Sequence, residues 1–241
     1  MSGSVSGRRA GHKVRVVFGA AAAVVLLSVS AVNAQMGSFT DPRDGKKYRT
    51  VKIGNLTWMA QNLNFKTGNS WCYYDDLSNC EKYGRLYDWE TAMTACPAGW
   101  RLPDNKDWND LIKRAGGQRI ELDTNIAYWS SGGEKLKSKI GWSDLWCDKE
   151  LKEVLNELGE DCVIGKMNSG NGTDNFGFSA LPGGFCYTSG ICLNAGSKGY
   201  WWSATEDGSG DAYYWYMNSD YDSVSEVSRD KDYGFSVLCV R

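Results

Sequence analysis

Eight cysteines constrain the fold of this chain more than any other feature of its sequence. All eight lie between residues 72 and 239, so the first 71 residues contain none. An even number of cysteines in an exported chain is typical of a framework of disulfide bonds. A zinc site is the alternative, but the spacing contains no pair of CxxC elements.

Proximity along the chain suggests three local disulfides, each closing a polar loop, and it leaves the last two cysteines for each other. The sequence alone does not choose among the many possible pairings. The suggested pairs are Cys72–Cys80, Cys147–Cys162, Cys186–Cys192 and Cys96–Cys239.

The first 34 residues have the pattern of a signal peptide. A basic segment containing Arg8, Arg9, Lys13 and Arg15 precedes an apolar run from Val16 to Val29, and Val32 and Ala34 suit cleavage after Ala34. A single-pass anchor is the alternative, but the run is short for a membrane span. We therefore expect export through the general secretory pathway to the periplasm, the cell surface or the medium, with no span in the mature chain.

Charge and histidine content exclude several classes of function. Residues 1–34 carry four of the 27 Lys and Arg and none of the 29 Asp and Glu, so the mature chain would have a net charge of about −6. That is the wrong sign for a nucleic-acid-binding protein, which must neutralise phosphates. The only histidine, His12, lies in the predicted signal peptide, which excludes histidine-dependent catalysis and histidine-ligated zinc in the mature chain.

Two segments in the first half have clear local signals. The segment 47–59 (KYRTVKIGNLTWM) predicts a hairpin, because alternating apolar residues flank the turn Gly54-Asn55. Helices are expected over 86–95, where Pro97 follows, and after Asp104, which is a plausible N-cap with Asp107 three residues later. Gly116-Gly117 would end the second helix.

The rest of the chain predicts one α+β domain over 35–241. A third amphipathic helix is expected from Lys149 to Leu158, inside an insertion at about 143–165 that Cys147–Cys162 would close. Turns rich in Gly, Ser and Asp separate the candidate strands, and no internal repeat is evident. These strands are Phe176 to Ala180, Tyr200 to Thr205, Tyr213 to Met217 and Phe235 to Val240.

Six segments in order, from near Asp41 to Arg241, resemble the Fibrobacter succinogenes major paralogous domain family. The segments are YRTVKIGNLTWMAQNLN, YGRLYDWETAMTACPAGWRLPDNKDWNDLI, KLKSKIGW, GNGTDNFGFSALPGG, GYWWSATE and YGFSVLCVR. The chain departs from the family pattern in the Cys147–Cys162 segment, which looks longer than usual, and in its extra local cysteine pairs.

The resemblance implies a C-type-lectin-like fold, with two helices packed on a small, twisted, mostly antiparallel sheet and with long loops. It also supports Cys96–Cys239, because that fold ties its first helix to its last strand. Formylglycine-generating enzymes share the broad fold and need reactive thiols. A structural disulfide at Cys239 would leave no such thiol, so we do not expect an enzyme.

Aromatic side chains in the C-terminal third are the best candidates for ligand binding. Neighbouring residues of a strand point to opposite faces, so some of these rings would be exposed if one sheet face is solvated. Exposed flat rings stack well on sugars, whereas the alternative is that all of them are core. The candidates are Trp201, Trp202, Tyr213, Tyr214, Trp215 and Tyr216.

No cofactor is expected, although one segment has a weak resemblance to a calcium site. Asn218, Asp220 and Asp222 alternate and would bring three oxygen ligands together. Ordinary turn chemistry is the alternative, because Asn and Asp are favoured in turns and no complete EF-hand pattern is present.

These observations predict a secreted or cell-surface binding module. Its partner would be a polysaccharide, recognised through exposed aromatic rings and polar loops, or alternatively an envelope protein that the chain displays or contacts. An oxidase-like enzyme fits the sequence less well than either kind of binding module.

Overall fold

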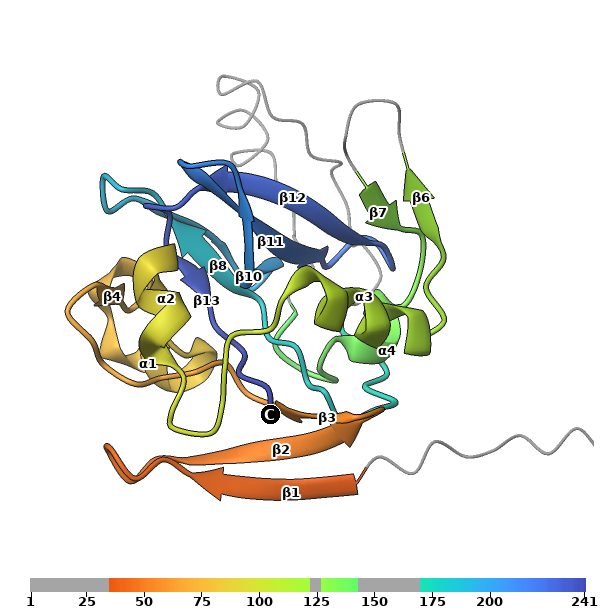
Figure 1. The fold of residues 1–241 in the computed structure, drawn as a ribbon, viewed down its shortest axis with the longest axis horizontal. Helices are drawn as coiled ribbons and strands as arrows, with labels where there is room; N and C mark the ends of the chain where they lie inside the picture. Colours follow the sequence, from red (N-terminus) through yellow and green to blue (C-terminus); the bar gives the residue numbers. More distant parts are fainter. Residues whose placement is uncertain (1–34, 122–126, 143–169) are drawn as a thin grey trace, which may run out of the picture. The chain divides into compact units, whose positions relative to one another are not determined.

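The predicted hairpin forms most of a small antiparallel sheet. The computed structural model describes residues 35–121, 127–142 and 170–241. In it β2 (Lys47–Ile53) and β3 (Leu56–Met59) pair around Gly54, whose φ of 64° suits a hairpin turn. β1 (Gln35–Thr40), which the sequence did not predict, pairs along the other side of β2 (Figure 1).

The larger sheet is mostly antiparallel, and its order is β4-β5-β13-β10-β11-β12-β7-β6, with β8 joined to β10 and β9 joined to β8. Among the named strand pairs of the described segments, only β10 with β13 and β10 with β8 are parallel. The strands are β4 (Ser70–Trp71), β5 (Leu86–Tyr87), β6 (Arg119–Glu121), β7 (Ala127–Trp129), β8 (Gly183–Cys186), β9 (Cys192–Ala195), β10 (Lys198–Asp207), β11 (Asp211–Asn218), β12 (Val224–Asp230) and β13 (Phe235–Ser236).

The helices are short, and side-chain caps fix where three of them begin. The predicted capping box of α3 (Asn105–Arg114) is confirmed, because the Asp104 side chain accepts from the Asp107 amide and the Asp107 side chain accepts from the Asp104 amide. Asp88 caps α2 (Trp89–Ala95) and Asp76 caps α1 (Leu77–Tyr83). In the described residues the other helical turns are η1 (Tyr73–Asp75), a 3-10 turn, and α4 (Gly133–Leu136).

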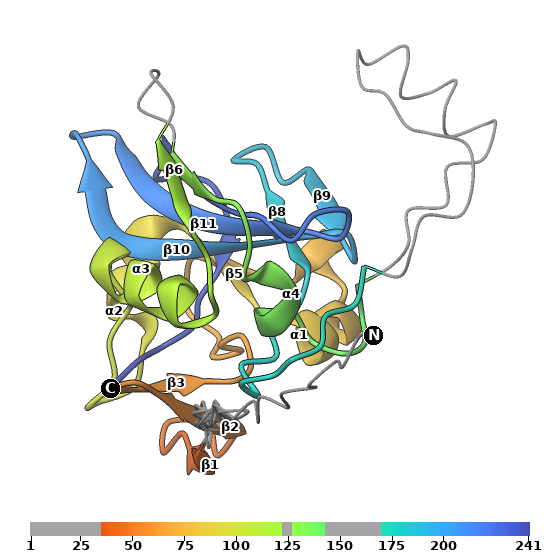
Figure 2. The same ribbon diagram turned by 90° about the vertical axis from the view of Figure 1, so that its right-hand side faces the viewer.

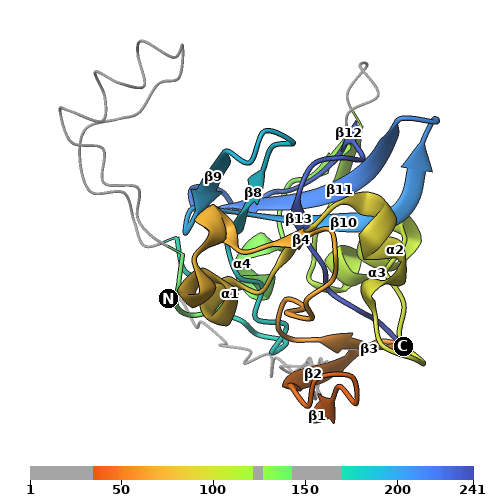
Figure 3. The ribbon, with the colours of Figure 1, turned by 90° about the vertical axis from the view of Figure 1, so that its left-hand side faces the viewer.

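Helices α2 and α3 lie on the same side of β10 (Figures 2 and 3). On that side Trp108 of α3 stacks on Trp215 of β11, with ring centroids 5.9 Å apart. On the other side Phe235 of β13 packs on Trp202, with ring centroids 4.4 Å apart. Trp108, Trp202 and Trp215 have no exposed surface, so the side chains on the two faces of β10 and β11 form the centre of the core. Burying each large apolar side chain contributes about 1.5–3 kcal/mol.

Three disulfides staple this framework, and they join cysteines that the sequence pairs. They are Cys72–Cys80, Cys96–Cys239 and Cys186–Cys192, and no cysteine of the described segments is free. The second bond ties the end of α2 to the C-terminal segment, which runs beside β3 through bonds such as Met59 N–H to Cys239 O (Figure 1). The predicted pair Cys147–Cys162, the insertion at 143–165 and the helix from Lys149 to Leu158 lie outside the described residues.

The structure corrects several predicted elements. The segment 86–95 begins as strand β5 and becomes helical only after Asp88, because that side chain caps the Thr91 amide. The predicted strand 176–180 is irregular, since Ser179 has a φ of 55° and bonds to the Asp174 carboxylate. Only Phe235–Ser236 of the predicted strand 235–240 is a strand.

No helix in the described ranges is long and apolar enough to cross a membrane.

Candidate binding site

The two central strands place their aromatic rings on opposite faces, as the alternation of a strand requires. Trp201 pairs with Trp215, and Trp202 pairs with Tyr214. Trp201 lies against Trp108 of α3, whereas Trp202 lies against Phe235. The face of Trp201 is therefore the helix-covered face, and the opposite face carries Trp202 together with the Phe235 side chain of the neighbouring strand β13.

The expectation that these rings are exposed is wrong for most of them. Trp201, Trp202 and Trp215 have no exposed surface, and Tyr214 is 7% exposed. Each indole N–H also has an internal acceptor: Asn62 Oδ1 for Trp201, Tyr87 O for Trp202 and Asn105 Oδ1 for Trp215. Trp108 of α3 packs on the Trp201 and Trp215 rings, and the Phe235 side chain from the neighbouring strand β13 packs on the Trp202 ring. These tryptophans are therefore core residues and offer no surface to a ligand.

Tyr213 and Tyr216 are half-buried, and the structure separates them. Tyr213 shares the helix-covered face with Trp215, since the two are two residues apart on β11. Tyr216 lies on the face of Tyr214 and stacks on Tyr200, with ring centroids 5.8 Å apart. Of the six predicted rings, Tyr214 lines the hollow described next, and Tyr216 stands on the same face outside its lining.

A hollow of about 110 Å³ opens on the face that carries Tyr214, and we call it the aromatic hollow. Four segments contribute to it: β8 with the residue after it, the pair β10–β11, β12, and β13 with the turn before it. Six of its seven lining residues are aromatic. The lining residues are Phe185, Tyr187, Tyr200, Tyr214, Arg229, Tyr233 and Phe235.

The rings of the aromatic hollow hold one another in place. Phe185 lies edge-on to Tyr187 and to Tyr200, with ring centroids 4.9 and 5.1 Å apart. Tyr187 lies 5.3 Å from Tyr233 and is 38% exposed, so it stands at the rim. A rim ring supported by buried rings loses little freedom when a ligand stacks on it, which favours binding.

Two buried phenols of the aromatic hollow, Tyr200 and Tyr214, are neutral at physiological pH. Burial raises the pKa of Tyr214 to about 12 and raises the pKa of Tyr200 further above its ordinary value. The Tyr200 hydroxyl accepts a hydrogen bond of 3.1 Å from Asn194. Arg229 is the only charged residue of the lining, and its guanidinium carbon lies 5.9 Å from the Tyr233 ring centroid.

A second, smaller hollow of about 60 Å³ adjoins the first, because Tyr187 lines both. Trp71, which is 36% exposed, lines its other side. The Trp71 ring rests on Gly234, where an added Cβ would lie 3.3 Å from Trp71 Cε3, so a side chain at this position would press on the ring. Cys72 and the Cys186–Cys192 disulfide also line this hollow, so two stapled loops carry it.

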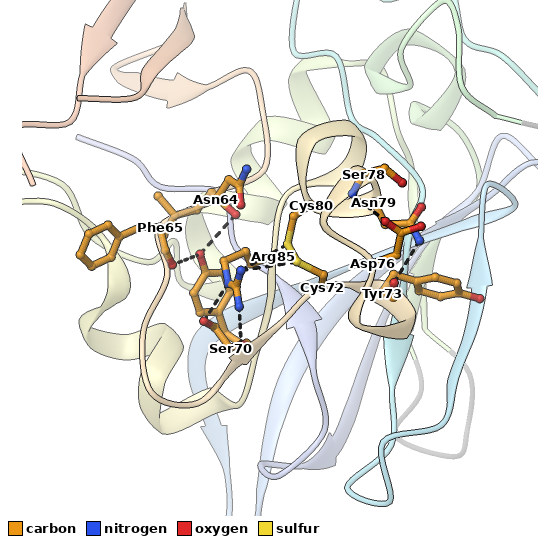
Figure 4. The surroundings of a disulfide bond; sticks show 12 residues. Asn64, Phe65, Ser70, Cys72, Tyr73, Asp76, Ser78, Asn79, Cys80 and Arg85 are labelled. Atoms are coloured by element: carbon orange, nitrogen blue, oxygen red, sulfur yellow. Dashed lines mark hydrogen bonds between the residues drawn. A yellow bond between two sulfur atoms is a disulfide. The ribbon is translucent and has the colours of Figure 1, made fainter. Parts of the chain in front are cut away.

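A buried arginine supports the loop that carries Trp71. The Arg85 guanidinium is enclosed behind the Cys72–Cys80 disulfide and donates to Ser70 O at 2.7 Å and to Ser70 Oγ at 2.9 Å (Figure 4). It also lies 3.5 Å from Cys72 Sγ and 3.4 Å from Cys80 Sγ. These contacts fix the strand before Cys72, and with it the backbone of Trp71.

The turn that carries the calcium candidates already holds a cation of the protein. Lys137 Nζ donates to Asn218 O at 3.0 Å and to Tyr221 O at 3.1 Å. The Asp222 carboxylate accepts from the backbone amides of Gly132 and Glu134 at the start of α4. Asn218 Oδ1 accepts from the Asp220 amide at 3.0 Å, so these oxygens have turn and capping partners.

Within the segments that the structure describes, no group of three His, Cys, Asp or Glu side chains is placed to hold a metal ion.

All residues that line the two hollows lie in the part of the chain that matches a known family. The model of the Fibrobacter succinogenes major domain family matches residues 51–241. The chain belongs to this family. Both hollows therefore lie within the Fibrobacter succinogenes major domain, as do the three disulfides. No curated protein and no solved structure matches the chain.

Sequence reasoning missed most residues of the aromatic hollow. Phe185 and Tyr187 flank Cys186, and Tyr233 precedes the final strand, so each stands beside a stapled or buried element. That adjacency was the available signal, although it does not distinguish Tyr187, which is 38% exposed, from Phe185, which is buried. Arg229 gave no signal, since its face depends on the register of β12, a strand that was not predicted.

Proposed function

We propose that this chain is a non-catalytic binding module that recognises polysaccharide at the aromatic hollow. We further propose that its architecture is C-type-lectin-like. Support for that placement comes from α2 and α3 packed on one side of a mostly antiparallel sheet, and from the disulfide that ties the end of α2 to the C-terminal segment.

The observation that carries the proposal is the aromatic lining of the hollow, with Tyr187 exposed at its rim. Flat rings bury the apolar face of a sugar with little loss of side-chain entropy, and their hydroxyls bond to sugar hydroxyls. The sequence predicts that the tryptophans stack on the sugar. Because they are buried, we assign this role to Tyr187 and Tyr233. Trp71 beyond Tyr187 extends the surface, which favours a ligand of more than one sugar unit.

Two features support binding without catalysis. The residues after the predicted signal peptide include no histidine, which removes the usual general base near neutral pH. Cys239 is joined to Cys96, so its sulfur offers no thiolate for oxidase-like chemistry.

We also propose that the protein is exported and acts on the cell surface, in the periplasm or in the medium. The disulfides support this proposal, because such bonds persist in oxidising compartments. The amino-terminal pattern of basic, apolar and small residues supports it independently.

Retention on insoluble cellulose, xylan and pectin tests the proposal. We expect the purified protein to be retained on at least one of them, and Tyr187→Ala to weaken retention by about tenfold because it removes a stacking ring. Tyr221→Ala is the matched control, since Tyr221 is 64% exposed but does not line either hollow. Absence of retention on all three, or equal loss in the two variants, would contradict the proposal.

A further inference from the structure

The alternation of β11 and β12 sorts their charged side chains by face. Directly opposite residues of an antiparallel pair share a face, and here Asp211 opposes Asp230 while Trp215 opposes Glu226. All three carboxylates thus share the helix-covered face. Arg229 opposes Ala212 and lies on the other face with Tyr214, where these two strands carry no acidic residue.

Arg229 makes no ion pair within the described part of the chain. Two other cations of this sheet region are paired with carboxylates. Arg119 lies 3.4 Å from Glu226, and Lys231 lies 3.7 Å from Glu206. The one guanidinium that faces the aromatic hollow is therefore available to an outside anion.

Nothing in the lining competes with a ligand for that guanidinium. The other six lining residues are aromatic, and the buried phenols of Tyr200 and Tyr214 are neutral at physiological pH. A guanidinium presents a planar fork of N–H donors that matches a carboxylate. The aromatic hollow thus combines a ring-stacking surface with Arg229, which can bind one negatively charged group.

The net charge of the protein does not cancel this local preference. The formal net charge is −2 for the whole chain and about −6 without residues 1–34, and either charge by itself repels an anionic polymer. Salt at physiological strength screens exposed charges beyond about 8 Å, whereas a carboxylate in contact with Arg229 is much less screened. The contact between Arg229 and a carboxylate therefore decides whether the hollow prefers an acidic or a neutral polysaccharide.

We propose that the ligand of the aromatic hollow is an acidic polysaccharide, in which a uronate carboxylate pairs with Arg229 while neighbouring sugar rings stack on Tyr187 and Tyr233. This inference rests on the proposed function, because it names the class of sugar that the same hollow selects.

Titration calorimetry with polygalacturonate and with its fully methyl-esterified form tests the inference. The esterified polymer keeps the sugar rings but has no carboxylate charge. We expect polygalacturonate to bind at least about tenfold more tightly than the ester, in keeping with a charged hydrogen bond. Arg229→Gln should lower the affinity for polygalacturonate until it no longer exceeds that for the ester, whereas Arg229→Lys should retain part of the difference because it keeps the charge without the fork.

Lys52→Gln is the matched control. It removes one exposed positive charge from β2, far from the lining of either hollow, and should leave both affinities unchanged. Equal binding of the two polymers by the unmodified protein would overturn the inference and leave the proposed function standing. An equal loss in Lys52→Gln and Arg229→Gln would also overturn it, since general attraction would then explain the binding. If neither polymer nor any neutral polysaccharide binds, the proposed function itself fails.

Discussion

Tyr214 shows how one buried phenol links the chemistry of the aromatic hollow to the stability of the protein. Its ring packs 4.6 Å from Phe235, and burial raises its pKa from 10.0 to about 12. The folded state therefore holds the phenol proton over a pH range in which the unfolded chain has lost it. This contribution to the free energy of unfolding is fully present below pH 10 and is lost as the pH rises toward 12.

We predict that Tyr214→Phe lowers the sensitivity of the protein to alkali. A pKa shift of this size corresponds to about 2–3 kcal/mol per phenol. Between pH 10 and 12 the free energy of unfolding of the variant should therefore fall by about that amount less than that of the unmodified protein. Urea denaturation at a series of pH values measures the difference. Tyr74→Phe is the control, because Tyr74 is 61% exposed. Identical slopes for Tyr214→Phe and the unmodified protein would refute the prediction.

Among the elements, α4 and the turn between β11 and β12 form one unit around Lys137. The side chain is buried, donates to Asn218 O and Tyr221 O, and lies 5.4 Å from the Trp142 ring centroid. Burial lowers the pKa of Lys137, and the carboxylates of Asp222, Glu134 and Asp220 oppose that shift. The ammonium therefore stabilises the turn in the way that a bound cation would.

We predict that Lys137→Met destabilises the protein by about 2–3 kcal/mol, because two carbonyl oxygens lose a charged donor and the nearby carboxylates lose their cation. The measurement is the midpoint of chemical denaturation. Lys135→Met is a nearby control whose ammonium donates only to Ala115 O among the described residues. Added calcium should leave the midpoint of the unmodified protein unchanged, and a calcium-dependent rise would show instead that the turn binds the ion.

Local signals were enough to predict some elements, and the register of distant strands decided the rest. The hairpin around Gly54 and the capping box at Asp104 depend on residues within one short segment, so the sequence predicts them. The strand β12 (VSEVSRD) carries only two apolar residues and forms because it pairs with β11 and β7. Its register alone places Arg229 in the aromatic hollow.

The burial of aromatic residues was likewise beyond sequence reasoning. Alternation correctly assigned Trp201 and Trp202 to opposite faces, but it cannot tell what covers each face. Trp201 is covered by Trp108 of α3, and Trp202 is covered by the Phe235 side chain of β13, and both partners are distant from β10 in the sequence. The exposed rings that line the two hollows, Tyr187 and Trp71, instead adjoin Cys186 and Cys72.

For the whole molecule, the Cys96–Cys239 bond matters more than the local disulfides. It joins residues 143 apart, whereas Cys186–Cys192 joins residues six apart. In the chain-entropy model the long closure contributes about 5 kcal/mol and the short one about 2 kcal/mol, because a longer loop restricts the unfolded chain more. The long bond also fixes the C-terminal segment that follows β13, the strand that pairs with β10 and packs Phe235 on Trp202.

We predict that the double variant Cys96→Ala/Cys239→Ala loses about twice as much free energy of unfolding as Cys186→Ala/Cys192→Ala. Each pair removes two sulfurs, so the comparison separates loop closure from lost packing. Guanidinium denaturation without reductant measures both. The long-bond variant should also lose retention on polysaccharide at temperatures where the short-bond variant is still folded, because β13 supplies Phe235 to the floor of the hollow. Equal stability losses would mean that native packing, and not closure of the long loop, holds the terminal segment in place.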